Sequence, residues 1–178
     1  MAQAVSEAPV PRWRPRGRAW AMLGAGLLGW AAHGAIRDWR DSHAFLVNLT
    51  DSLPNWAFLI HRTRAPARGD YMFFNAPRNV LVTRHFGATP PMFGKRVFGM
   101  PGDTITHDGP LVRVNGRPVA RMKPGTRWGE MLTPGPTGVI PRGCYYVGTS
   151  HKDGFDSRYA EIGLICARQI IGIGEPVL

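Results

Sequence analysis

The sequence predicts a mainly β domain of antiparallel strands, preceded by one N-terminal transmembrane helix. After residue 42 the apolar residues come in short runs separated by turn residues, and the chain contains 22 glycines and 16 prolines. One stretch, residues 19–36, carries no formal charge. With 44% hydrophobic and 19% charged residues in 178, the chain can build one folded core, which excludes a disordered protein.

The N-terminal part indicates a membrane anchor. A helix over residues 19–36 would be about 27 Å long, close to the thickness of the hydrocarbon core of a bilayer. Trp20 and Trp39 flank this stretch, where interfacial aromatic residues are favoured. A basic tail, residues 1–18, precedes it and contains four arginines, which predicts a cytoplasmic N-terminus and a body from residue 42 to 178 on the outer side. A buried core helix and a cleaved secretory signal are the alternatives.

The strands of the body are predicted from short apolar runs. The strongest local signal is Asn115-Gly116, because both residues favour the positive φ angles of a two-residue hairpin. Residues 123–143 are rich in proline and glycine and predict a long loop, and no helix is expected after residue 36. The predicted strands are 44–49, 56–61, 70–74, 79–84, 95–99, 111–114, 118–122, 144–148 and 169–173.

Charge and composition narrow the partners. The net charge of +10 suggests nucleic acid or an anionic membrane, but the arginines are dispersed and no aromatic-basic motif occurs, so we expect membrane lipid and no nucleic acid. Cys144 and Cys166 are too few for a disulfide framework and could pair if the body is exported, which stays open. No histidine has the spacing of a metal site, and neither a cofactor nor a metal is expected.

Three segments carry residues that could do chemistry. Ser52 follows an apolar strand, and Pro54 favours an extended Leu53, which would hold the serine hydroxyl at a strand end. Lys95 is one of only three lysines and has apolar neighbours, so burial would lower its pKa. Asp156 and Arg158 would share one face of an extended segment and could pair. The plain alternatives are that Ser52 lies in an ordinary turn, that Lys95 lies at a sheet edge, and that Asp156 and Arg158 lie in a solvated loop.

Five short motifs occur in the order found in one enzyme family. The chain resembles the type I signal peptidase family, and more closely its conjugative-transfer branch of TraF-type pilin-processing peptidases, over residues 48–177. The motifs are Ser52-Leu53-Pro54, Gly69-Asp70-Tyr71, Lys95-Arg96-Val97 with Gly99-Met100-Pro101-Gly102-Asp103, Val114-Asn115-Gly116, and Phe155-Asp156-Ser157-Arg158-Tyr159.

The resemblance implies a signal-peptidase-like catalytic domain with a Ser/Lys dyad. Ser52 would be the nucleophile and Lys95 the general base, since a desolvated lysine can remove the proton of a serine. The backbone N–H of Ser52 and the side chain of Thr50 would bind the oxyanion, while Asp156 and Arg158 would support the site. Leader peptidases have a serine that orients the lysine where this chain has Gly154, so another hydroxyl would have to do this.

The expected function is a serine endopeptidase anchored in the bacterial inner membrane, with its catalytic domain in the periplasm. It would process exported preproteins, foremost a conjugative prepilin in a type IV secretion or plasmid transfer system. Hydrolysis and cyclisation of the product both stay open. One alternative is a catalytically inactive anchored β domain that serves in pilus or secretion assembly. A soluble self-cleaving repressor is disfavoured, because residues 1–36 contain no helix-turn-helix pattern.

Overall fold

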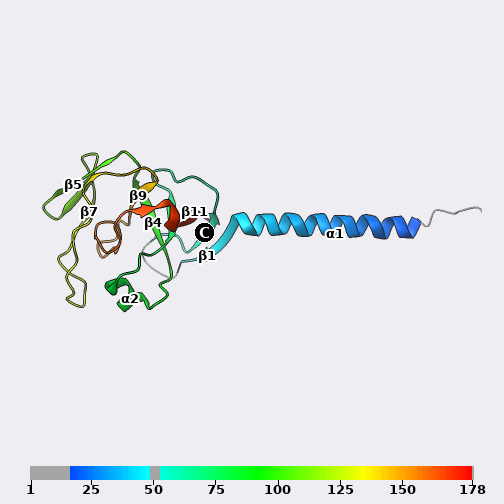
Figure 1. Ribbon diagram of the computed structural model, residues 1–178, viewed down its shortest axis with the longest axis horizontal. Helices are drawn as coiled ribbons and strands as arrows, with labels where there is room; N and C mark the ends of the chain where they lie inside the picture. The colour runs from blue at the N-terminus through cyan, green and yellow to red at the C-terminus, as the bar shows by residue number, and fades with distance from the viewer. Residues whose placement is uncertain (1–16, 49–52, 178) are drawn as a thin grey trace, which may run out of the picture. The chain divides into compact units, whose positions relative to one another are not determined.

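The computed structural model describes residues 17–48 and 53–177, and the chain forms two units, Met1–Trp39 and Arg40–Leu178 (Figure 1). Thr50 and Ser52 lie outside the described residues. The mainly β, antiparallel fold class predicted from the sequence is confirmed for the body.

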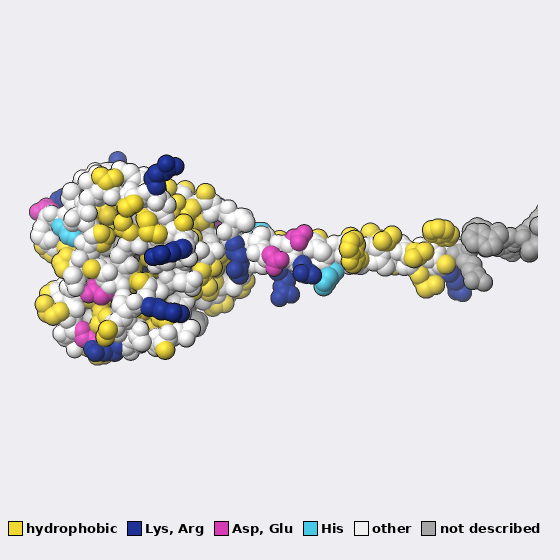
Figure 2. All heavy atoms as spheres, in the orientation of Figure 1, with side chains coloured by type: hydrophobic (Ala, Val, Ile, Leu, Met, Phe, Trp, Pro, Cys, Tyr) yellow, Lys and Arg dark blue, Asp and Glu magenta, His cyan; other side chains and the backbone are white. Residues whose placement is uncertain are grey.

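Helix α1, Gly17–Ser42, extends beyond the predicted 19–36 at both ends. It is long and apolar enough to cross a membrane, and none of its residues is buried in the protein, unlike the residues of a core helix. Figure 2 shows hydrophobic side chains along the N-terminal half of the helix and most of its charged side chains near the C-terminal end. That distribution fits a helix whose apolar length lies in lipid and whose last turns lie in water.

A seven-stranded antiparallel sheet forms most of the body, in the order β1-β2-β11-β3-β4-β9-β10. The inner strand β4 pairs with β3 on one side and β9 on the other, so the residues of β4 lie in the interior of the sheet. The strands are β1 His43–Val47, β2 Ala57–His61, β3 Tyr71–Asn75, β4 Met92–Gly99, β9 Cys144–Gly148, β10 Ile165–Cys166 and β11 Ile170–Pro176.

A smaller four-stranded sheet has the order β7-β6-β5-β8, with strands β5 Thr104–Asp108, β6 Leu111–Val114, β7 Arg117–Arg121 and β8 Gly138–Val139. Between β6 and β7, Asn115 has φ 49° and Gly116 has φ 77°, which confirms the predicted hairpin turn. The sequence prediction omitted β5, because its polar threonines and histidine hide the alternation around Ile105.

The predicted strand 79–84 is wrong, because this segment forms helix α2, Val80–Phe86. Asn79 is the N-cap, and its side chain accepts a hydrogen bond from the N–H of Val82 at 2.9 Å. Gly87, with φ 84°, ends the helix. Val82 is buried in the core, and this contact and the cap outweigh the β preference of Val80 and Val82.

Two further predicted segments differ in detail. Strand β4 begins at Met92, earlier than the predicted 95–99. The loop 123–143 contains the short strand β8 and two isolated bridges, Gly125↔Met131 and Pro134↔Tyr159, which fasten it to itself and to the following segment. Cys144 and Cys166 form a disulfide between the paired strands β9 and β10.

The main core covers the face of the large sheet on which Phe93, Lys95 and Val97 alternate with exposed or half-buried neighbours along β4. Met72 of β3 is the register partner of Lys95 and is fully buried on the same face. Helix α2 packs over this face through Val82. The fold therefore places a lysine side chain inside an apolar layer.

The cap of α2 generates a stability prediction. Asn79 also donates from its side chain to the carbonyl of Glu161 at 2.6 Å, so it ties the helix to the segment before β10. We expect Asn79→Ala to lower the free energy of unfolding by about 1–2 kcal/mol, measured by urea denaturation, because it removes both hydrogen bonds. Asn79→Ser keeps a capping hydroxyl and should lose less. Equal losses in the two variants would contradict the role of the cap.

Candidate active site

Lys95 lies on β4, an inner strand of the large sheet, and only 5% of the residue is exposed. Phe93 and Val97 flank it on the same strand, and Met72 lies beside it on β3. Burial lowers the pKa of Lys95, an effect that the charge of Asp156 opposes and the charge of Arg158 reinforces. The predicted burial of this lysine is confirmed, and the alternative of a lysine at a sheet edge is wrong.

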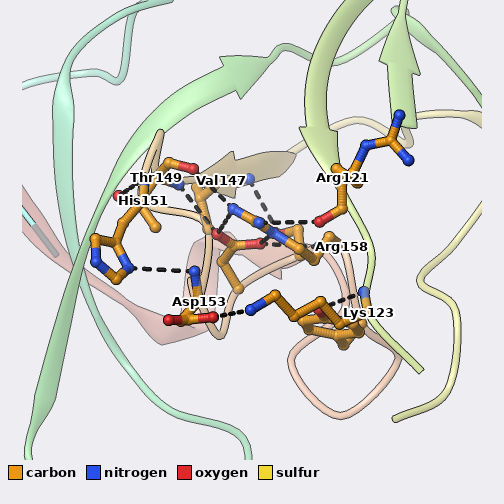
Figure 3. Close-up of polar contacts among 10 residues, drawn as sticks. Arg121, Lys123, Val147, Thr149, His151, Asp153 and Arg158 are labelled. Atoms are coloured by element: carbon orange, nitrogen blue, oxygen red, sulfur yellow. Dashed lines mark hydrogen bonds and ion pairs between the residues drawn. The ribbon is translucent and has the colours of Figure 1, made fainter. Parts of the chain in front are cut away.

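Asp156 and Arg158 form a buried, bidentate ion pair, and Figure 3 shows Arg158 beside Thr149. Arg158 Nε donates to Asp156 Oδ1 and Nη2 donates to Oδ2, each at 2.8 Å. Burial disfavours the charged guanidinium, but its hydrogen bonds to Asp156 and the charge of that carboxylate outweigh burial and raise the pKa of Arg158. The two residues pair as the sequence suggested, and they do not belong to a solvated loop.

The ion pair also holds the segment that carries it against β9. Asp156 Oδ2 accepts from the N–H of Thr149 at 3.0 Å, and Arg158 Nη2 donates to the carbonyl of Thr149 at 2.7 Å. Ser157 lies between them, and its N–H donates to the carbonyl of Val147 at 3.1 Å while its hydroxyl accepts from the N–H of Val147 at 3.0 Å. Residues 156–158 are therefore held along the end of β9 by hydrogen bonds to the backbone of residues 147 and 149.

Thr149 is a residue that the sequence analysis did not single out. Arg96 of β4 pairs with Gly148 of β9, and continuing that register by one residue places Thr149 opposite Lys95 on the same face. Its side chain is 5% exposed, and its hydroxyl accepts a hydrogen bond from the N–H of His151 at 3.1 Å. No local sequence signal could have identified it, because its proximity to Lys95 depends on the pairing of two distant strands.

Gly154 has a packing reason to lack a side chain. A Cβ placed there would lie 2.3 Å from Cγ2 of Thr149, 2.7 Å from Nη2 of Arg158 and 2.8 Å from Oδ2 of Asp156. The methyl group of Thr149 thus occupies the space that a serine at position 154 would need. Glycine at position 154, where leader peptidases have a serine, is therefore linked by packing to the threonine at position 149.

Ser52 and Thr50 lie outside the described residues, but their flanks are described on both sides. Asn48 donates from its side-chain amide to the carbonyls of Leu53 at 3.1 Å and Asn55 at 3.0 Å. Leu53 is buried, and a Cβ on Gly94 would lie 3.0 Å from it. The residue after Ser52 therefore packs against the residue before Lys95.

The site therefore brings together Lys95, Asp156 and Arg158 of the predicted residues, and adds Thr149. Among residues 17–48 and 53–177, no group of three or more histidine, cysteine, aspartate or glutamate side chains is arranged to hold a metal ion. A buried amine of lowered pKa, next to a fixed ion pair, is a base that can act without a metal or a histidine.

The chain is similar to a known protein family and to individual known proteins. A family model described as signal peptidase, peptidase S26, matches residues 32–178. The conjugal transfer protein TraF of Agrobacterium fabrum is 27% identical over 146 residues, which are 75% of this chain and 81% of that protein. A solved signal peptidase I from Enterococcus faecalis is 22% identical with a TM-score of 0.38, and the match covers 62% of this chain and 97% of that structure.

The buried ion pair generates the prediction of this subsection. Arg158→Met leaves the Asp156 carboxylate buried without its partner, and we expect the free energy of unfolding to fall by about 3–5 kcal/mol. The matched control is Arg113→Met, which removes an exposed pair with Asp108 and should cost about 0–1 kcal/mol. Urea denaturation of both variants measures the difference. Losses of similar size would show that the buried pair does not hold the segment.

Proposed function

Because the chain belongs to the signal peptidase family, peptidase S26, we propose that it is a membrane-anchored serine endopeptidase in which Lys95 is the general base for Ser52. The observation that carries this proposal is the burial of the Lys95 amine, which lowers its pKa, on the sheet that also receives Leu53, the neighbour of Ser52. A lysine is a useful base only when part of it is neutral at the working pH, and desolvation provides this condition.

The proposed reaction begins when the neutral amine of Lys95 takes the hydroxyl proton of Ser52. The serine oxygen attacks the carbonyl carbon of the scissile bond, and the developing oxyanion is bound by the N–H of Ser52 and the hydroxyl of Thr50. The protonated Lys95 then gives its proton to the leaving amine as the C–N bond breaks, which leaves an ester on Ser52. Lys95 next removes a proton from water, and the attack of that water on the ester releases the acid product and restores Ser52.

In this reaction Asp156 and Arg158 position Lys95 and do not transfer protons. Their pair fixes the segment against β9, and their opposite charges act on the amine in opposite directions. Burial of the ion pair also fills the space beside the amine with protein, which excludes water that would restore an ordinary lysine pKa.

Thr149 is proposed as the hydroxyl that orients Lys95 in place of a serine at position 154. A hydroxyl has one proton to donate and two lone pairs that accept, so the Thr149 hydroxyl can accept from the N–H of His151 and also donate to a neutral amine or accept from a charged one. This arrangement supports activity over the alternative of an inactive anchored β domain, which Gly154 alone would favour.

The proposed location is the bacterial inner membrane, with the body in the periplasm. Helix α1 has the length and composition of an anchor, and the arginines before it favour a cytoplasmic N-terminus. The disulfide between Cys144 and Cys166 supports a body in an oxidising compartment. For the substrate, the similarity to a conjugal transfer protein supports a role in conjugation, and we propose an exported prepilin.

The dyad is tested by processing of a prepilin co-expressed with the full chain. We expect Ser52→Ala and Lys95→Met to abolish maturation, because they remove the nucleophile and the base. Lys95→Arg should also be inactive, since a guanidinium keeps its charge and cannot accept the proton. Lys152→Met is the matched control, because Lys152 is an exposed lysine, and it should mature the pilin normally.

Maturation by any of the three dyad variants would overturn the assignment. Where the wild-type chain matures the pilin, intact-mass measurement separates the two outcomes that the sequence left open. A product one water lighter than the linear chain indicates cyclisation, and the linear mass indicates hydrolysis.

The orienting role of Thr149 gives a separate prediction. Thr149→Val keeps the shape of the side chain but removes the hydroxyl, and we expect kcat to fall about tenfold or more with little change in KM. Thr149→Ser keeps the hydroxyl and should retain most of kcat. If valine and serine variants have the same kcat, or if KM carries the change, Thr149 has only a packing role.

A further inference from the structure

A cavity of about 530 Å³ lies between helix α2 and residues 123–132. Its walls are mainly aromatic and aliphatic, and they are formed by Leu81, Phe86, Trp128, Leu132, Phe155 and Tyr159. Cavities of this size with apolar walls are typical of sites that take part of a ligand. Nothing in the proposed reaction at Lys95 uses this cavity.

Among the charged side chains on the cavity wall, Lys123, Asp153 and His85 are paired, whereas Arg127 is exposed and lies over the Trp128 ring, with its Cζ 5.9 Å from the ring centroid. Lys123 donates to Asp153, as Figure 3 shows. His85 lies against Glu130, whose carboxylate also accepts from Arg84 at 2.8 Å. A charged ligand group would have to compete with these pairs, and most of the remaining wall is apolar, so the lining favours an apolar group.

The wall opposite α2 is held in place before any ligand arrives. A bridge between Gly125 and Met131 closes the loop, and the hydroxyl of Thr126 donates to Glu130 at 3.0 Å. Trp128 stacks on His85 with ring centroids 4.5 Å apart and is nevertheless 70% exposed. The cavity therefore has a fixed wall with an accessible aromatic surface at its rim, which lowers the entropic cost of binding.

The cavity adjoins the candidate active site through Gly154. This residue lines the cavity, and the position of its missing Cβ is surrounded by Thr149, Asp156 and Arg158. Gly154 therefore borders both the cavity and the cluster around Lys95. The two lie close together, so a polypeptide with its scissile bond near Lys95 can place another of its side chains in the cavity.

We propose that this cavity is a substrate subsite. It takes one uncharged, bulky apolar side chain, aromatic or long aliphatic, from the polypeptide substrate that the Ser52/Lys95 dyad cleaves. The proposal rests on the proposed function, because it assigns the occupant to the substrate of that reaction. The cavity would recognise a substrate residue that lies away from the scissile bond, and would so contribute to substrate specificity.

The test uses the full chain in detergent micelles and a series of alanine- and serine-based peptides. A single phenylalanine is moved along the peptide on both sides of the cleaved bond, and each peptide is compared with serine at the same place. Cleavage is measured with the wild-type chain. Binding of the same dye-labelled peptides is measured by fluorescence anisotropy with Ser52→Ala, which does not consume them.

At one position we expect phenylalanine to improve both affinity and kcat/KM by about tenfold or more over serine. Leu132→Trp fills the cavity and should abolish that preference, and Trp128→Ala should weaken it. Met131→Trp is the matched control, because Met131 is adjacent in the chain and 81% exposed but does not line the cavity, so it should keep the preference. Urea denaturation of each variant checks that it remains folded.

The outcomes separate this proposal from the proposed function. A phenylalanine preference in binding to Ser52→Ala, together with no cleavage by the wild-type chain, would support the subsite and overturn the dyad. Cleavage without a preference at any position, or a preference that survives in both Leu132→Trp and Trp128→Ala, would overturn the subsite alone. Absence of peptide binding in every case would also overturn the subsite.

Discussion

The bidentate pair between Asp156 and Arg158 is the interaction on which the arrangement of the site depends. Two charges can be buried at this depth only because each satisfies the other and the remaining hydrogen bonds reach the backbone of Thr149, just after β9, and of Arg121 in β7. The pair fastens its own segment to the end of β9 and so completes the wall beside Lys95. Without that wall, water would reach the amine and the pKa of Lys95 would return toward its ordinary value.

The sheet supplies the second constraint. Register on both sides of β4 decides which side chains share the face of Lys95, and these are Met72 from β3 and Thr149 beyond the end of β9. Along β4 itself, Phe93 and Val97 complete an apolar layer. A lysine in such a layer is costly to fold in its charged form, and this cost is the physical origin of its proposed use as a base.

Features with a local cause could be predicted from the sequence. The hairpin at Asn115-Gly116 depends on two residues, and the burial of Lys95 follows from its immediate neighbours. The family membership inferred from five ordered motifs is confirmed by the family match over residues 32–178. The segment 79–84 was predicted wrongly because its apolar residues suit a strand, whereas a cap by Asn79 and a tertiary contact of Val82 decide for a helix. Thr149 could not be predicted, since strand register is not visible in one sequence. The catalytic roles of Ser52 and Lys95 stay predictions, as do the supporting roles of Thr50, Asp156 and Arg158 and the domain boundaries.

The central claim is that the amine of Lys95 is neutral in a substantial fraction of molecules at a pH where an exposed lysine is charged. The most direct test is an NMR titration of the full chain in detergent micelles with labelled lysine side chains. Only three lysine signals are present, and Lys123→Arg and Lys152→Arg assign two of them. The account predicts that the Lys95 signal titrates well below the ordinary lysine pKa of about 10.4. A Lys95 signal that titrates at the ordinary lysine pKa would contradict the account.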